Sequence, residues 1–270
     1  MIEKITSTQN PRIKHLLLLQ RKSSLRREEH VFVVEGMREL EHCVEGGFKI
    51  DTIFFCDEIL HADNDMFDVE SMQKKFGEEA KIIPVSKNVY ERIALREGTE
   101  GIVAIVETRE TRLDDLHLSE SPLLIVLESV EKPGNLGAVL RSADAAGADA
   151  VIVCDPLTDL YNPNLIRSSI GAIFTVPCVA CQSEECISFL KSRGIQILTA
   201  QLQDSKLYYD TDMRRATAIV MGTESTGLTN QWREAADAHI RIPMLGRLDS
   251  LNVSVSAAIL LFEALRQRKV

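Results

Sequence analysis

Apolar and polar positions follow two patterns along the chain, and together they predict alternating strands and helices. Short continuous apolar runs, such as VFVVEG at 31–36 and LLIVLE at 123–128, predict strands that are covered on both faces. Between such runs the apolar residues recur at helical spacing, as in KNVYERIAL at 87–95. Alternation of this kind is typical of α/β folds.

The pattern divides the chain into two α/β segments joined by a polar stretch. We expect a small α/β domain over residues 1–108, a linker over 109–121 and a larger domain over 122–270. In the first domain, a basic helical segment at 11–29 precedes predicted strands at 31–36, 50–56, 81–86 and 101–107 and helices at 37–45, 68–76 and 87–95. In the second, strands are predicted at 123–128, 150–153, 174–179, 195–200, 217–222 and 239–244, and helices at 134–148, 162–172, 184–194 and 251–269.

The last predicted helix differs from the others because its first part is apolar nearly all round. Such a helix is expected to be buried, either in the core or at a subunit interface.

Composition and charge restrict the class of protein. The chain has 270 residues, of which 45% are hydrophobic, enough for a buried core. The first residues contain no apolar signal region, and no apolar run approaches the roughly 20 residues that cross a bilayer. We therefore expect a soluble, cytoplasmic protein with no membrane partner.

The net charge of −9 conceals a basic N-terminal segment. Residues 1–30 carry seven Lys or Arg against three Glu, and a local basic patch can bind phosphate on an acidic protein because salt screens distant charges. A solvated helix face is the alternative, and charge alone favours it. The candidate RNA-binding positions in this segment are Arg12, Lys14, Arg21, Lys22, Arg26 and Arg27.

The six cysteines are expected to be reduced thiols. CVACQSEEC at 178–186 contains a Cys-x2-Cys pair and a third cysteine, which suggests part of a zinc site. However, no histidine is near and a fourth ligand is missing, so we expect no metal and interpret these cysteines as small apolar residues at strand ends.

Three loops that follow predicted strands are rich in Gly, Ser, Thr and Asn: ESVEKPGNLGAVLR, MGTESTGL and IPMLGRLDSLNVS. In parallel sheets, ligands bind beyond the carboxyl ends of the strands. Gly134 and Gly137 give G-x-x-G, which matches neither the dinucleotide fingerprint nor the Walker loop. No nucleophile elbow or paired-carboxylate arrangement stands out.

These loops resemble the three signature motifs of the SpoU/TrmH branch of the SPOUT RNA methyltransferases, in the same order and spacing. GNLGAVLRSADAAG, GTESTGL and IPMLGRLDSLNVSVSAAI carry the resemblance, which covers residues 122–268. STQNPRIKHLLLL and FVVEGMRELEHCV more loosely resemble the family's substrate-binding domain, which is similar to RNA-binding ribosomal-protein folds.

The resemblance implies a trefoil knot in the second domain, a homodimer through the last helix, and methyl transfer from S-adenosylmethionine to a ribose 2′-hydroxyl of structured RNA. The attached first domain favours ribosomal RNA over transfer RNA as the substrate. The catalytic residues implied are Arg141, Asn135, Glu224, Ser250 and Asn252. The cofactor-binding residues implied are Thr199, Gly222, Ile242, Leu251 and Asn252.

Several of these residues have simpler interpretations. A guanidinium is almost always protonated, so Arg141 either holds an RNA phosphate that accepts the proton or becomes a base in a dry site; we favour the phosphate clamp. It could instead pair with Asp144. Asn135 and Ser250 could cap helices. The other functions considered are an RNA-binding protein of the same fold that has lost catalysis, and methylation of a base.

Overall fold

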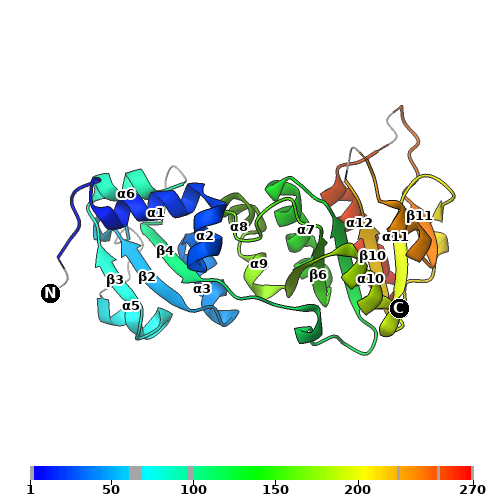
Figure 1. The fold of residues 1–270 in the computed structure, drawn as a ribbon, viewed down its shortest axis with the longest axis horizontal. Coiled ribbons are helices and arrows are strands. Elements are labelled where there is room, and N and C mark those ends of the chain that lie inside the picture. Colours follow the sequence, from blue (N-terminus) through cyan, green and yellow to red (C-terminus); the bar gives the residue numbers. More distant parts are fainter. Residues whose placement is uncertain (1–2, 61–68, 96–99, 224–225, 248–249, 269–270) are drawn as a thin grey trace. The chain divides into compact units, whose positions relative to one another are not determined.

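The computed structural model describes residues 3–60, 69–95, 100–223, 226–247 and 250–268 (Figure 1). The chain folds into two compact units. The first is Met1–Arg109 together with Tyr161–Thr175, and the second is Glu110–Leu160 together with Val176–Val270.

The first unit is built on a four-stranded mixed sheet. The strands lie in the order β1 (Val31–Glu35), β4 (Ile102–Glu107), β2 (Ile50–Phe55) and β3 (Lys81–Pro84). β4 is antiparallel to both of its neighbours, and β2 and β3 are parallel. The helices of this unit, before the segment from Tyr161, are α1 (Pro11–Arg21), α2 (Ser23–Glu29), α3 (Met37–Glu45), α4 (Asp57–Leu60), α5 (Val69–Phe76) and α6 (Lys87–Ile93).

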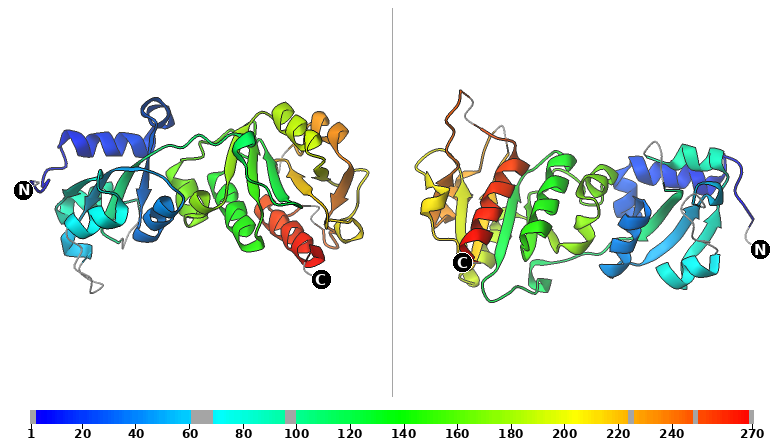
Figure 2. Two further views of the ribbon diagram at one scale, coloured as in Figure 1. Left: turned by 90° about the horizontal axis from the view of Figure 1, so that it is seen from below. Right: turned by 180° about the vertical axis from the view of Figure 1, so that it is seen from behind.

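Helices cover both faces of this sheet (Figures 1 and 2). Ile13 and Leu16 of α1 and Tyr90 of α6 share one buried core with Phe54 and Val103 of the sheet. α3 and α5 pack against each other and against β1 and β3, respectively. The small α/β architecture expected for this part of the chain is therefore present.

A segment from the middle of the chain completes the first unit. α8 (Pro163–Ser169) and α9 (Ala172–Thr175) belong to it, whereas the sequence pattern suggested one continuous domain from residue 122. The rings of Tyr161 and Phe174 stack on Phe32 at centroid distances of 4.4 and 5.8 Å. The strand expected at 174–179 is wrong at its start, because Phe174 lies in α9 and packs on these rings while β7 begins at Cys178.

The second unit contains a seven-stranded sheet in which every pairing is parallel. The strand order is β7 (Cys178–Cys181), β6 (Ala150–Cys154), β5 (Leu123–Glu128), β10 (Thr217–Met221), β8 (Gln196–Ala200), β11 (Ala238–Arg241) and β9 (Lys206–Leu207). Its helices are α7 (Pro133–Ala146), α10 (Ser183–Ser192), α11 (Asn230–Ala235) and α12 (Val253–Arg268). The mostly parallel α/β sheet predicted from the apolar runs is confirmed.

α7 and α12 pack against each other, and α10 and α11 pack against each other elsewhere on the sheet. The core beneath α10 and α11 includes Val126, Ile152, Phe189 and Trp232. Because side chains alternate along a strand, the neighbouring residues of β5 and β6 point to the opposite face, where α7 and α12 pack on the sheet. Figure 2 shows α12 beside α7.

Part of the expected linker is folded into the second unit. Leu113 and Leu116 are buried in the same core as Trp232, and Leu113–Asp115 form a 3-10 turn. The carboxylate of Asp149 accepts hydrogen bonds from the backbone amides of Ser119 and Leu123 at 2.8 Å each. The polar composition of 109–121 thus reflects a surface segment that is anchored at several points.

The last helix, α12, is buried on one side only. Val253, Ala257 and Leu260 lie in the interior, whereas the side chains of Val255 and Phe262 are 48% and 46% exposed. The sequence predicted that this helix is buried either in the core or at a subunit interface. One face of α12 lies in the core, and its other apolar face lies at the surface. Among the described residues, no helix is long and apolar enough to cross a membrane.

Candidate functional site

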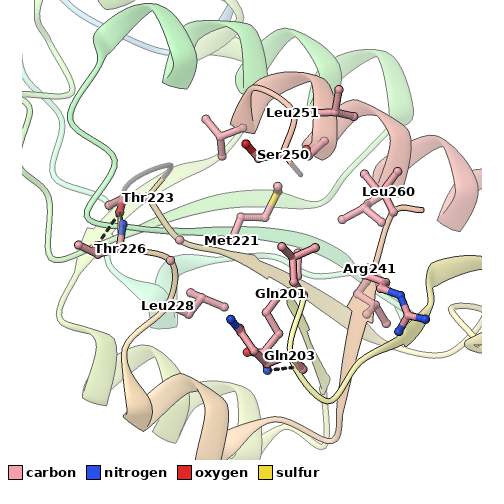
Figure 3. A pocket seen from close by; sticks show the side chains of 18 of the residues that line it. Gln201, Gln203, Met221, Thr223, Thr226, Leu228, Arg241, Ser250, Leu251 and Leu260 are labelled. Carbon is pink, nitrogen blue, oxygen red and sulfur yellow. Dashed lines mark hydrogen bonds between the residues drawn. The ribbon is translucent and has the colours of Figure 1, made fainter. Parts of the chain in front are cut away.

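A cavity of about 380 Å³ lies at the carboxyl ends of β8, β10 and β11, beside the start of α12 (Figure 3). Sites for small ligands typically have volumes from about 300 to 1,000 Å³. Its walls are formed by Ala200, Gln201, Leu202, Gln203, Met221, Gly222, Thr223, Thr226, Gly227, Leu228, Arg233, Ile240, Arg241, Ile242, Met244, Ser250, Leu251, Val253, Ser256 and Leu260.

The loop after β10 forms one wall because two glycines allow it to fold tightly. A Cβ atom on Gly222 would lie 2.3 Å from the carbonyl carbon and oxygen of Gly227, so no larger residue fits there. Gly227 itself has a φ of +68°, which favours glycine. The amide of Thr226 donates to Oγ1 of Thr223 at 3.0 Å, and the two threonine hydroxyls are hydrogen-bonded to each other at 2.7 Å.

A buried carboxylate anchors the far end of this loop to the sheet. Glu128, the last residue of β5, accepts hydrogen bonds from the amide of Thr229 at 2.9 Å and from its hydroxyl at 2.6 Å. Thr229 is the residue before α11, so Glu128 fixes the start of this helix relative to β5.

The cavity has apolar walls and a few polar groups that point into it. Met221, Ile242 and Leu251 are among the apolar residues, and Figure 3 shows Leu251 and Ser250 on one side with Gln201 and Gln203 on the other. Oε1 of Gln201 and Nε of Arg233 are buried and have no hydrogen-bond partner in the described part of the chain. Since buried polar atoms are nearly always paired, these two atoms suit a ligand that carries both an acceptor and a donor.

The sequence-predicted cofactor residues are partly gathered here. Gly222, Ile242 and Leu251 line the cavity, and so does Ser250. Thr199 is fully buried in β8 one residue before the wall begins, and its hydroxyl is hydrogen-bonded to Nδ1 of His239 at 2.6 Å. Thr199 therefore lies behind the wall of the cavity and not in it.

Asn252 and Asn135 are brought together from opposite ends of the second unit's sequence. Nδ2 of Asn252 donates to Oδ1 of Asn135 at 3.1 Å. Oδ1 of Asn252 accepts from the amide and hydroxyl of Ser254 at 2.9 and 2.6 Å, which is the geometry of a helix N-cap. Neither residue is among those that line the cavity.

Two capping interpretations from the sequence are therefore wrong. α12 is capped by Asn252 and not by Ser250, because α12 begins at Val253. Asn135 is not the residue before α7, because that helix starts two residues earlier, at Pro133. The side chain of Asn135 thus projects from the first turn of α7, where it meets Asn252.

Arg141 lies in the third turn of α7, on its exposed side. It is not part of the cavity wall, although α7 packs against α12, which supplies Val253 and Leu260 to that wall. Within the described ranges its guanidinium makes no hydrogen bond or ion pair, so it is not paired with Asp144 as the simpler interpretation required. Glu224 lies outside the described residues.

Five of the six basic positions predicted to bind RNA are exposed in the first unit: Arg12, Lys14, Arg21, Lys22 and Arg27. Arg26 is not on this surface, because it is only 3% exposed and its Nη1 donates to the carbonyl of Leu19 at 2.5 Å. Arg26 therefore satisfies the C-terminal end of α1, and the expectation that it faces RNA does not fit the structure.

Sequence reasoning missed the polar wall of the cavity. Gln201 and Gln203 follow β8, and Arg233 comes from α11, which the pattern did not predict. The only sequence signal for the glutamines was their position directly after a strand of a parallel sheet. Arg233 carried none, because it lies outside the glycine-rich motifs.

Two known families match this chain. Residues 122–262 match the SpoU rRNA Methylase family, and residues 10–104 match the MRM3-like substrate binding domain.

Individual relatives span most of the chain. A 23S rRNA (uridine(2479)-2'-O)-methyltransferase of Streptomyces viridochromogenes is 31% identical over 251 residues, covering 88% of this chain and 83% of the relative. The 23S rRNA (guanosine(2553)-2'-O)-methyltransferase RlmP of Bacillus subtilis is 29% identical over 263 residues, covering 97% and 98%. The crystal structure of an AdoMet-bound rRNA methyltransferase from Sinorhizobium meliloti superposes with a TM-score of 0.87 at 30% identity, covering 98% of each chain.

Proposed function

Because this chain belongs to the SpoU rRNA methylase family, we propose that it transfers a methyl group from S-adenosylmethionine to a ribose 2′-hydroxyl of ribosomal RNA. The observation that carries the proposal is the cavity, because residues of the second and third motif loops, Gly222, Ile242 and Leu251, meet in its walls. The first motif is linked to the third by the hydrogen bond between Asn135 and Asn252.

The cavity suits S-adenosylmethionine in its size and in its polar groups. Apolar wall residues such as Met221, Ile242 and Leu251 would provide a surface for the adenine, and the backbone around Gly222 and Leu251 would offer hydrogen bonds to its edge. Nε of Arg233, which has no hydrogen-bond partner among the described residues, offers a donor for the methionine carboxylate. Oε1 of Gln201 offers an acceptor for a hydroxyl or amine. When bound, the cofactor would supply its sulfonium methyl group to the ribose oxygen, with the S–CH3 bond broken and S-adenosylhomocysteine released.

Arg141 acts on the RNA side of the reaction. Its exposed guanidinium suits a bidentate contact with a phosphate next to the target ribose, and that phosphate then accepts the 2′-hydroxyl proton. An arginine that acts as a base would have to be desolvated, and the exposed position of Arg141 favours the clamp. Asn135 and Asn252 keep α7 and the start of α12 in register, so that Arg141 is held in a fixed position relative to the cavity wall.

The finer features of the family extend the proposal. The exposed apolar side chains of Val255 and Phe262 support a homodimer through α12, since isolated apolar faces of helices are usually covered. We also propose that the C-terminal end of the second unit forms the trefoil knot of the family. The proposed ribosomal RNA substrate supports a cytoplasmic location for the enzyme.

The first unit is proposed to select the RNA. It matches a substrate-binding family over residues 10–104, and its exposed cations at Arg12, Lys14, Arg21, Lys22 and Arg27 offer contacts to phosphates. A match to a domain of this kind favours a large structured RNA, and hence ribosomal over transfer RNA.

Mass spectrometry of nucleosides and oligonucleotides from ribosomal and transfer RNA tests the proposal, with cells that contain or lack the protein. The expected result is one 2′-O-methyl group of ribosomal RNA that is absent without the protein and restored by the wild-type chain. Loss of a methyl group from transfer RNA would contradict the substrate assignment. If no methyl group changes and the purified chain does not bind S-adenosylmethionine, the protein is an RNA-binding member of the fold without catalysis.

A further inference from the structure

Three buried thiols gather at the carboxyl edge of the second unit's sheet, away from the cavity. Cys154 ends β6, Cys181 ends β7 and Cys186 lies in the first turn of α10. Their sulfur atoms all lie within 4.8 Å of one another, and those of Cys154 and Cys181 are 4.0 Å apart. Cys154 and Cys186 are completely buried and Cys181 is 9% exposed.

The fold, and not the sequence spacing, creates this group. Cys154 and Cys181 are direct partners in the parallel pairing of β6 and β7, and α10 begins two residues after Cys181. The sequence pattern grouped Cys178, Cys181 and Cys186, but Cys178 is at the opposite end of β7. The cluster of three thiols is also separate from the cavity, since β5 lies between β6 and the strands that form the cavity wall.

The polar groups around the thiols are hydrogen-bonded to each other. The carboxylate of Asp155 accepts from the amide and hydroxyl of Ser183 at 3.3 and 2.5 Å. The same hydroxyl accepts from Nε1 of the buried Trp232 at 2.9 Å. No imidazole, carboxylate or fourth thiol of the described chain joins the group, so the set of potential ligands is three sulfurs.

We propose that Cys154, Cys181 and Cys186 bind one Cu(I) ion in a three-coordinate thiolate site. Metal–thiolate bonds of about 2.3 Å in a trigonal arrangement place the sulfurs about 4.0 Å apart, which is the separation of Cys154 and Cys181. Binding displaces a proton from each coordinated thiol to the solvent, and the ion keeps its oxidation state.

The ligand set distinguishes Cu(I) from other thiophilic metals. Structural zinc sites use four protein ligands, and catalytic zinc adds water in an open position, whereas these sulfurs are enclosed by Trp232 and the core beneath α10. Iron–sulfur clusters of the common types are held by four protein ligands, and the described residues offer three here. Soft thiolates with no oxygen or nitrogen ligand favour Cu(I).

Competition with the chromophoric chelator bicinchoninate tests the proposal. Reduced, full-length protein is added to the Cu(I)–bicinchoninate complex without oxygen, and the loss of its colour measures the copper withdrawn. The wild-type protein and the control variant Cys178→Ala are expected to withdraw one equivalent, and Cys186→Ala is expected to bind at least tenfold more weakly. Thermal melts followed by circular dichroism identify any variant that fails to fold.

X-ray absorption of the copper-loaded wild-type protein provides a readout that needs no variant. The proposal predicts three sulfur neighbours at about 2.3 Å. Two sulfur neighbours, a nitrogen or oxygen neighbour, equal weakening in Cys178→Ala, or no copper withdrawn would each overturn it. So would retention of Zn(II) in preference to Cu(I), or a Cys154–Cys181 disulfide in the protein as purified.

Discussion

Arg141 shows how a single residue can be recognised by its lack of a structural role. It is the exposed cation of a helix made mostly of small apolar residues, and in the described part of the chain its guanidinium has no partner. Because its charged group makes no contact with the described residues that stabilises the fold, Arg141 can serve the contact with RNA that we propose for it. Removing it should therefore affect the reaction and not stability.

We predict that Arg141→Ala lowers kcat for methyl transfer by about 100-fold or more, because the transition state no longer has this charge-assisted hydrogen bond. The dissociation constant for S-adenosylmethionine should change less than about twofold, since Arg141 is not in the cavity wall. Single-turnover transfer and calorimetry measure the two effects, and the exposed Arg193→Ala is the matched control. Unchanged kcat would remove Arg141 from the mechanism.

Arg233 is proposed to bind the cofactor, as Arg141 is proposed to bind the RNA. Its Nε is buried at the cavity and has no hydrogen-bond partner in the part of the chain that the structure describes. A charge-assisted hydrogen bond contributes about 1.5–3 kcal/mol. Arg233→Met should therefore weaken S-adenosylmethionine binding by about 10- to 100-fold, while the exposed Lys191→Met should not. Calorimetry with S-adenosylmethionine and with decarboxylated S-adenosylmethionine isolates this hydrogen bond: equal losses for the two ligands would contradict a role in holding the carboxylate.

At the scale of elements, the cavity depends on loops that are fixed to the sheet by a few side chains. Glu128 is the clearest example, because one buried carboxylate holds both the amide and the hydroxyl of Thr229 at the start of α11. α11 in turn carries Arg233. A hydrogen-bonded connection therefore runs from β5 through Thr229 to the helix that carries the proposed cofactor-binding side chain.

Replacing Glu128 by Ala should lower the free energy of unfolding by about 2 kcal/mol, because the two hydrogen bonds that its buried carboxylate accepts from Thr229 are lost. It should also weaken cofactor binding about tenfold. Thr229→Val removes only the hydroxyl hydrogen bond and is expected to show a smaller change in both quantities. Denaturant unfolding and calorimetry provide the measurements; a stable Glu128→Ala protein with wild-type affinity would show that the loop does not need this anchor.

At the scale of the whole molecule, the basic segment at the N-terminus has two parts with different roles. Arg21 and Lys22 are exposed and suited to phosphates, whereas Arg26 is buried against the end of α1. The double variant Arg21→Ala with Lys22→Ala should weaken binding to ribosomal RNA and reduce the slope of affinity against salt concentration by about one for each phosphate that is no longer neutralised. Arg26→Met should instead lower the melting temperature and leave this slope unchanged. The reverse pattern would contradict the assignment.

The sequence predicted most of the sheet, because apolar runs such as 123–128 mark parallel strands directly. It failed where packing between distant residues decides local structure. Phe174 was expected in a strand but lies in a helix because it packs on Phe32, which is far away in the sequence. α11 and β9 are too short for a periodic signal, and so the pattern missed them.

In the candidate site, too, the sequence predicted local features and missed those that depend on packing between distant residues. Motif spacing identified the loops with Gly222, Ile242 and Leu251, which line the cavity. It could not identify Gln201 or Arg233, since their roles depend on which strand and helix become neighbours in the sheet. It also could not find the hydrogen bond between Asn135 and Asn252, which are 117 residues apart in the sequence.

We propose that this chain methylates a ribose oxygen of ribosomal RNA. The most direct measurement incubates purified protein, S-adenosylmethionine with a trideuterated methyl group, and ribosomal RNA from cells that lack the protein, followed by mass spectrometry of the nucleosides. The deuterated methyl group is expected on the ribose of one nucleoside type, and Arg141→Ala is expected to eliminate it. Label on a base, or no label although the protein binds both cofactor and RNA, would show that the chain is not a ribose methyltransferase.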